Sequence, residues 1–219
     1  MNFNPIDLEN WSRKPYFEHY LNNVRCSYSM TAAIDITRLL SASKSMGFKL
    51  YPVFLHMITT VVNRLREFRT CYDADGQLGY WDSMSPSYTI FHQDDRTFSS
   101  IWTVYEEDFQ LFYRRYLEDN QMYGDVKQFA AKANEPANCF SVSSIPWVSF
   151  TGFNLNVYNE GTYLLPIFTL GKYERQGDKV LLPLAGQFHH AVCDGYHAGL
   201  LYQELQLLAD TGEQWLFGK

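Results

Sequence analysis

The segment His189-His190-Ala191-Val192-Cys193-Asp194-Gly195-Tyr196-His197 concentrates side chains that could perform chemistry. A histidine whose pKa is near neutrality can accept and return a proton, provided that a partner orients its ring. Side chains alternate along a strand, so we expect His189 and His190 to point to opposite faces. Gly195 suits a tight turn after the strand, and Asp194 could help to hold that turn.

Two other interpretations of this segment remain open on its residues alone. Histidine, cysteine and aspartate are common metal ligands, although no HxH or HxxxH pair would place two of them on one face of a single element. Alternatively, one histidine is buried in the core and its neighbour lies on the surface, with no chemistry at either.

The surrounding elements must deliver this segment to the edge of a sheet. Strands are predicted at 163–173 and 179–190, and a helix runs from Asp194 or Gly195 to about Asp210. Upstream, the patterns predict strands at 25–34, 69–72, 78–82, 87–92, 97–105 and 140–150, and helices at 16–21, 35–46, 52–68 and 108–123. This mixture predicts an α/β (α+β) fold, a two-layer sandwich with a mixed, largely antiparallel sheet, in a single domain spanning residues 1–219.

Composition excludes several classes of protein. The net charge of −6 and the pI of about 5.5 argue against nucleic acid as a partner. No apolar run approaches the roughly 18 residues of a membrane-spanning helix, and residues 1–14 lack the apolar core of an export signal. We therefore expect a cytoplasmic protein without a membrane partner, whose four separated cysteines are reduced: Cys26, Cys71, Cys139 and Cys193.

The HHxxxDG pattern of residues 189–195 resembles the signature of CoA-dependent acyltransferases of the chloramphenicol acetyltransferase type, and dihydrolipoyl acyltransferase catalytic domains share it. Further segments resemble that family in order along essentially the whole chain. They are the NWSR of 10–13, the FKLYPV of 48–53, the YTIFHQ of 88–93, the SSIPW of 143–147, the FNLN of 153–156 and the LLPL of 181–184.

The resemblance implies a role for each matching position. His190 would be the catalytic base, Asp194 would pair with Arg13 to brace the loop, Ser143 would donate a hydrogen bond to the oxyanion, and Thr169 would hold a water nearby. The implied acceptor pocket is lined by Tyr20, Cys26, Tyr28, Phe98 and Leu155, and the implied CoA contacts are Trp147, Tyr173, Lys49 and Lys172. Tyr28 and Ser100 fall at pocket positions where relatives vary.

The implied reaction moves an acetyl group from acetyl-CoA, a co-substrate and not a permanently bound cofactor, directly to a hydroxyl of chloramphenicol. The resemblance also implies a homotrimer whose active sites lie between subunits. From the spacing of the histidines, we expect no metal. No neighbour in the sequence is evidently placed to activate Cys26 or Cys193 as a nucleophile. A dihydrolipoyl acyltransferase-like domain and a non-catalytic protein that sequesters the drug are the alternatives.

Overall fold

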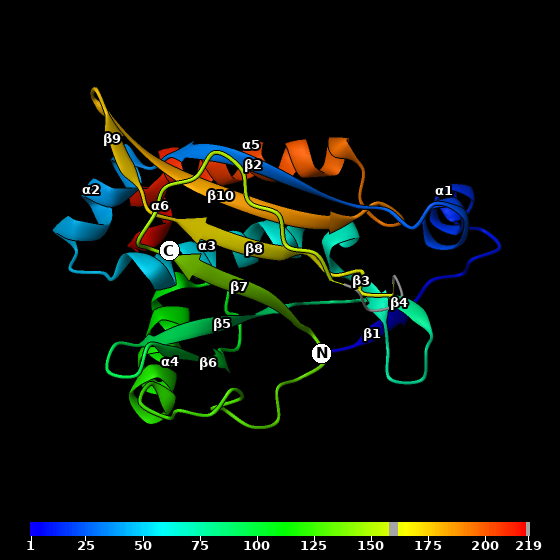
Figure 1. The fold of residues 1–219 in the computed structure, drawn as a ribbon, viewed down its shortest axis with the longest axis horizontal. Coiled ribbons are helices and arrows are strands. Elements are labelled where there is room, and N and C mark those ends of the chain that lie inside the picture. The colour runs from blue at the N-terminus through cyan, green and yellow to red at the C-terminus, as the bar shows by residue number, and fades with distance from the viewer. Residues whose placement is uncertain (158–161, 218–219) are drawn as a thin grey trace.

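A mixed sheet forms the centre of the computed structural model, which describes residues 1–157 and 162–217 (Figure 1). Among these residues the sheet has seven strands, six of them in the order β2-β10-β8-β7-β5-β6, with β9 paired to β10. The bounds are β2 Ser27–Asp35, β5 Ser85–His92, β6 Thr97–Trp102, β7 Cys139–Ile145, β8 Ile167–Gly171, β9 Glu174–Gln176 and β10 Lys179–His189. The β7 strand is parallel to both β5 and β8, and all other pairs are antiparallel.

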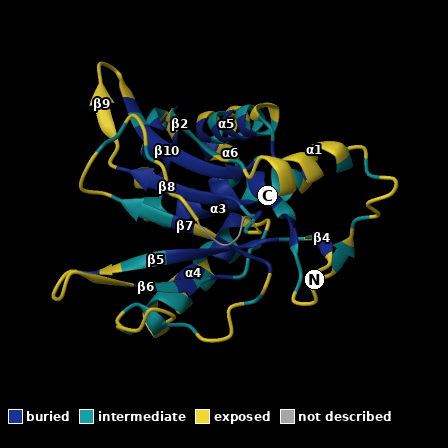
Figure 2. Cartoon of the chain, turned by 45° about the vertical axis from the view of Figure 1, so that its right-hand side comes forward, coloured by how far each residue is buried: buried dark blue, intermediate teal, exposed yellow. Residues whose placement is uncertain are grey.

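Helices cover one face of this sheet. The four long ones are α2 Thr37–Ser45, α3 Leu50–Arg64, α4 Phe109–Tyr123 and α5 Gly195–Asp210. Short helical turns are α1 Lys14–Glu18, η1 His19–Asn23, η2 Arg66–Arg69 and α6 Gly212–Leu216, and a small separate sheet joins β1 Phe3–Pro5, β4 Leu78–Trp81 and β3 Thr70–Tyr72. Figure 2 shows that burial is greatest where the strands meet these helices.

Alternation along the strands separates an apolar face from a polar one. Phe140 and Val142 of β7, and Phe168 of β8, belong to the core under the helices. Their neighbours Ser143 and Thr169 therefore point to the opposite face, which none of the described helices covers. A loop crosses that face after β7, since the Phe153 N–H donates to Thr31 Oγ1 of β2 at 3.3 Å. The sheet thus carries a row of small polar side chains on its helix-free side.

The predicted fold class is confirmed, and the differences lie at element ends. The predicted strand 163–173 is only Ile167–Gly171, because Pro166 has no N–H to donate to a strand ladder. The α3 helix begins at Leu50, two residues before Pro52. The expected turn at 174–178 instead contains β9, and the short elements β1 and α6 carried no pattern that predicted them.

Two further findings concern the described residues. None of their helices is both long and apolar enough to cross a membrane. The four cysteines are free thiols.

Candidate active site

His190 lies directly after β10 and is held by its backbone and by two aromatic rings. Its N–H donates to the Cys26 carbonyl at 2.9 Å. Its imidazole stacks on the Tyr20 ring with centroids 3.9 Å apart and planes 6° from parallel, and the Tyr28 ring meets it edge-on at 5.3 Å. About a quarter of the side chain (27%) is exposed, so the ring is fixed in orientation yet open to a ligand.

Arg13 binds the loop that follows His190. Its guanidinium forms a two-pronged ion pair with Asp194, with Nη1 to Oδ2 at 2.5 Å and Nη2 to Oδ1 at 2.7 Å. It also donates to the carbonyls of Ala191 and His190, at 2.7 and 2.8 Å. These four bonds lower the mobility of the loop, and the Arg13 hydrogen bonds hold the pKa of Asp194 below its ordinary value.

Asp194 lies close to His190 without forming a hydrogen bond to it. Its Oδ1 is 3.3 Å from His190 Nδ1, but the two groups are not aligned, and Nδ1 has no hydrogen-bond partner among the residues that the structure describes. The carboxylate therefore acts on the imidazole through its charge, and its directed bonds go to Arg13. This geometry favours a brace over a proton relay.

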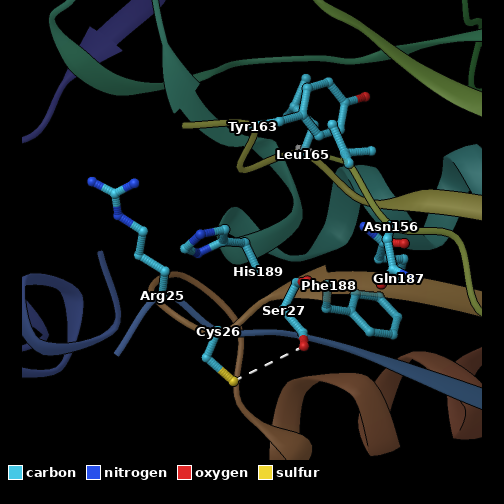
Figure 3. Close-up of a pocket in the computed structure, with 10 residues that line it drawn as sticks. Arg25, Cys26, Ser27, Asn156, Tyr163, Leu165, Gln187, Phe188 and His189 are labelled. Carbon is cyan, nitrogen blue, oxygen red and sulfur yellow. Dashed lines mark hydrogen bonds between the residues drawn. The ribbon is translucent and has the colours of Figure 1, made fainter. Parts of the chain in front are cut away.

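His189 faces the other way, as the strand alternation predicted. Its ring is buried, at 6% exposure, and its Nδ1 accepts from the Ala191 N–H at 3.2 Å. It lines a cavity of about 520 Å³ on the helix-free side, together with Cys26 and Gln187 (Figure 3). Only His190 is thus placed on the Tyr20 side, in contact with the Arg13 brace.

Ser143 and Thr169 form a hydroxyl pair on adjacent parallel strands. Their oxygens are 3.0 Å apart, and Thr169 is only 2% exposed. The register of β7 and β8 places these two residues directly opposite each other. Two hydroxyls at this distance can orient one another and leave one hydrogen to donate to an oxygen or a water in front of them.

One chain does not bring His190 and Ser143 together. Ser143 is opposite Thr169, and Thr169 is opposite Ala185 of β10, so His190 lies five residues farther along that strand. At a rise of about 3.3 Å per residue, this is roughly 16 Å along the strand and about two strand spacings across the sheet. The two side chains are also on opposite faces. Within one chain, the two groups therefore cannot act on the same reacting atoms.

A slot opens beside Ser143 where β5 and β7 separate. Their pairing stops at Tyr88 and Val142, after which the strands diverge (Figure 1). The resulting cavity has a volume of about 550 Å³ and is lined by residues from both faces of the sheet and from α3 and α4: Tyr51, Thr89, Ile90, Phe91, Phe98, Tyr116, Asn120, Ser143, Ser144, Pro146 and Trp147. Trp147 is exposed and packs edge-on against Phe91 with centroids 4.6 Å apart.

The remaining predicted CoA contacts lie around this slot. Lys49 is the N-cap residue of α3, two residues before Tyr51, and its N–H donates a hydrogen bond to the Tyr113 hydroxyl oxygen at 3.1 Å. Lys172 is tied to the Trp147 loop, because its N–H donates to the Val148 carbonyl at 2.9 Å. Lys49, Lys172 and Tyr173 are all exposed, so their side chains are free to meet a ligand at the surface.

The predicted acceptor residues divide between the two halves of the site. Tyr20 and Tyr28 contact the His190 ring, whereas Cys26 accepts from the His190 N–H through its carbonyl and lines the His189 cavity. Phe98 instead lines the Ser143 slot, and Leu155 lies in the loop that crosses the helix-free face. The structure therefore groups two of the five side chains with the candidate base and one with the candidate oxyanion donor.

Four aromatic residues near the slot were not among the predicted site residues. Tyr51, Phe91 and Tyr116 line it, and Phe129 meets Phe98 edge-on with centroids 6.1 Å apart. Tyr51 belongs to the quoted 48–53 segment, which was a usable signal. Phe129 follows an irregular polar stretch, and its 73% exposure is a tertiary property that no local pattern reveals.

The cysteines are poor candidates for a nucleophile. Burial raises the pKa of Cys193 to about 12 and that of Cys139 to about 12, and the nearby Arg13 offsets only part of this at Cys193. Both are therefore neutral thiols near pH 7, the less nucleophilic form. Within residues 1–157 and 162–217, no three His, Cys, Asp or Glu side chains gather as a metal site would require.

The fold and this arrangement define a class of protein. The structure superposes on a chloramphenicol acetyltransferase with a TM-score of 0.85 at 24% identity, covering 95% of this chain and 100% of the other. It superposes on the dihydrolipoamide acetyltransferase of Azotobacter vinelandii with a TM-score of 0.67 at 20% identity, over 92% and 88% of the two chains. The fold is that of the CoA-dependent acyltransferases.

Sequence comparison identifies the family. The profile described as "Chloramphenicol acetyltransferase" matches residues 1–206. A chloramphenicol acetyltransferase of Clostridium perfringens is 64% identical over 216 residues, 99% of each chain, and one of Clostridium butyricum is 62% identical over the full length of both. The chain belongs to the chloramphenicol acetyltransferase family and is an acyltransferase. The predicted family is confirmed.

Proposed function

We propose that this protein transfers the acetyl group of acetyl-CoA to a hydroxyl of chloramphenicol, and so inactivates the antibiotic. The observation that carries the proposal is His190, whose ring is stacked on Tyr20 and whose loop is bound by Arg13. A rigid, partly exposed imidazole is suited to general acid–base catalysis. Family membership supports the donor and the acceptor.

The proposed reaction has two proton transfers, and it replaces the C–S bond of the thioester with a C–O bond to the acceptor. His190 removes the proton from the acceptor hydroxyl while that oxygen attacks the thioester carbonyl, and a tetrahedral oxyanion forms. Ser143, with Thr169 behind it, donates a hydrogen bond to this oxyanion. The C–S bond then breaks, and the imidazolium of His190 returns its proton to the CoA thiolate.

The slot between β5 and β7 is the proposed path for the pantetheine arm. It connects the side of α3 and α4 with the Ser143 side of the sheet, so the thioester could reach the hydroxyl pair from the far face. Trp147 and Tyr173 would hold the adenine and pantetheine at its mouth. Lys49 and Lys172 would approach the phosphates, which lysine binds as a point charge.

The separation of His190 from Ser143 supports sites shared between chains. In the proposed homotrimer each subunit contributes its His190 half to one neighbour and receives the Ser143 half of the other, as a head-to-tail ring requires. Phe98 would then face the acceptor from one chain, and Tyr20 from the next. Ser143 and the exposed Ser141 lie on the sheet face opposite the described helices, where a neighbouring chain would pack. We also propose a cytoplasmic location, where four free thiols would stay reduced.

Release of the CoA thiol tests the proposal against its alternatives. The purified protein is given acetyl-CoA with chloramphenicol, with dihydrolipoamide, or with neither. Free CoA is then separated from acetyl-CoA by chromatography and quantified, because acetylation of a lipoyl thiol consumes one thiol for each CoA thiol released. We expect rapid release of CoA only in the sample that contains chloramphenicol. Preference for dihydrolipoamide would show a dihydrolipoyl acyltransferase, and drug binding without release would show a sequestering protein.

A further inference from the structure

His197 and Glu67 lie beside the catalytic loop, and the mechanism above gives them no role. His197 is the third residue of α5, whose N-cap is Asp194. Its Nδ1 accepts a hydrogen bond from the Asp194 backbone N–H at 3.0 Å. This is one arm of a capping box, in which glutamate or glutamine usually occupies the place that histidine has here.

The hydrogen bond fixes the tautomer of His197. Because Nδ1 accepts, the neutral ring carries its proton on Nε2, and that nitrogen lies 3.7 Å from Glu67 Oε1. Glu67 comes from η2, the turn that follows α3. The ring thus lies between the Glu67 carboxylate and the backbone of Asp194, with Nδ1 hydrogen-bonded and Nε2 near Glu67 but beyond hydrogen-bond distance.

Asp194 is consequently held from two sides. Arg13 binds its carboxylate in a two-pronged ion pair, and His197 binds its backbone N–H. The carboxylate Oδ1 lies 3.3 Å from His190 Nδ1, at a position that these contacts determine together. The charged groups facing His197 are Asp194 on its own helix and Glu67 on η2, with Arg13 on the far side of Asp194.

We propose that His197 and Glu67 are positioning residues for acyl transfer, which hold Asp194 in register with Arg13 and His190. The inference rests on the proposed function, because its effect is expressed through the His190 base. An ordinary helix cap would stabilise α5 and leave turnover unchanged. Displacement of a catalytic group by about 1 Å can lower a rate by as much as 10²-fold, so the two roles predict different kinetics.

Four variants separate these roles. His197→Ala removes the capping bond, whereas His197→Gln can restore it, since glutamine occupies this place in many capping boxes. Glu67→Ala removes the outer partner from a partly exposed turn, and it keeps the test available if His197→Ala does not fold. The matched control is Asp108→Ala, which removes the N-cap of α4, where Asp108 accepts from the Leu111 N–H at 2.8 Å.

The kinetic readout is kcat and the KM of both substrates, with the melting temperature beside them. We expect His197→Ala to lower kcat roughly tenfold or more, Glu67→Ala to lower it by about threefold, and each KM to change less than about twofold. His197→Gln should recover kcat to within about threefold of the wild type. Asp108→Ala should melt earlier and keep the wild-type kcat.

Three results would overturn the inference: unchanged kcat in both His197→Ala and Glu67→Ala, an equal loss of kcat in His197→Gln and His197→Ala, or an equal loss in Asp108→Ala. A second readout does not need turnover, namely the imidazole ¹⁵N signals of His190, assigned by their absence in His190→Ala. These signals should shift in His197→Ala and stay unchanged in Asp108→Ala. A wild type that releases no CoA thiol would refute the proposed function, and the ¹⁵N signals would still decide the role of His197.

Discussion

Two adjacent histidines of this chain have different surroundings, and the difference follows from strand alternation. His190 stacks on Tyr20 and keeps a quarter of its side chain exposed, while His189 is buried and accepts from the Ala191 N–H. A base must reach its substrate, so exposure and a fixed orientation select His190. The predictions at the scale of the residue test this selection and the partners of His190.

Replacing His190 with alanine should abolish most turnover, and replacing His189 should not. One residue serves both proton transfers in the proposed reaction, so we expect His190→Ala to lower kcat by about 10⁴-fold. His189→Ala should keep activity within about tenfold while melting earlier, because it opens a buried position. CoA thiol release and thermal melting measure both. An equal loss of kcat in the two variants would reject His190 as the particular base.

Ser143 should act in the transition state. We expect Ser143→Ala to lower kcat by about 10²-fold with little change in either KM, because an oxyanion donor is used mainly when negative charge develops. Ser141→Ala is the matched control, since Ser141 lies on the same strand and face and is exposed. If the KM of Ser143→Ala rises while kcat stays constant, Ser143 binds substrate instead.

The Arg13–Asp194 ion pair should contribute stability that depends on pH. Arg13 depresses the pKa of Asp194, so this contribution is present above the ordinary pKa of about 4 and is lost as the pH falls through the folded-state value. Asp194→Asn should lower the free energy of unfolding by about 1–2 kcal/mol near neutral pH. Breaking a fully buried ion pair costs more, ~3–5 kcal/mol, but 37% of the Asp194 side chain is exposed.

Urea unfolding of the wild type and Asp194→Asn across about pH 7 to about pH 3 measures this difference. The gap in unfolding free energy should narrow as the pH falls. A gap that stays constant, or one that is absent at every pH, would show that the ion pair does not stabilise the fold.

At the scale of the element, the long segments were predictable and the short ones were not. The α3, α4 and α5 helices and the β10 strand carry enough periodic apolar residues to identify them. The three-residue strands β1 and β9 are too short to show a periodic pattern, and each is defined by its pairing, β1 with β4 in the small sheet and β9 with β10 across a short turn. The resemblance to the family predicted the Arg13–Asp194 contact. The slot beside Ser143 was not predicted, because it arises where the parallel strands β5 and β7 diverge, and no sequence motif encodes that divergence.

Trp147 at the mouth of that slot should affect the donor and not the acceptor. We expect Trp147→Ala to raise the KM for acetyl-CoA roughly tenfold, as loss of an exposed aromatic contact to a ligand does, with the KM for chloramphenicol nearly unchanged. Steady-state kinetics with each substrate varied in turn measure both values. A selective rise in the KM for chloramphenicol would show that Trp147 contacts the acceptor, and it would refute the proposed path of the pantetheine arm.

At the scale of the whole molecule, the two halves of the proposed site lie on opposite faces of one sheet. Tyr20 belongs to the His190 half and Phe98 to the Ser143 half. A single chain therefore carries both halves, but they are too far apart to form one site. In the proposed ring, a neighbouring chain would complete each site. In this proposal, the His190 variant removes the base that one chain contributes to a site, and the Ser143 variant removes the oxyanion donor that its neighbour contributes.

Activity restored by mixing two inactive chains tests this central claim most directly. His190→Ala and Ser143→Ala are unfolded together in equal amounts and refolded, beside each variant alone and the wild type treated identically. Random trimers with sites between chains should recover about a quarter of the wild-type rate, because about three-quarters of the rings are mixed and each mixed ring has one intact site. Should the mixture stay as inactive as the separately refolded variants, while the refolded wild type is active, each site belongs to one chain and the account is contradicted.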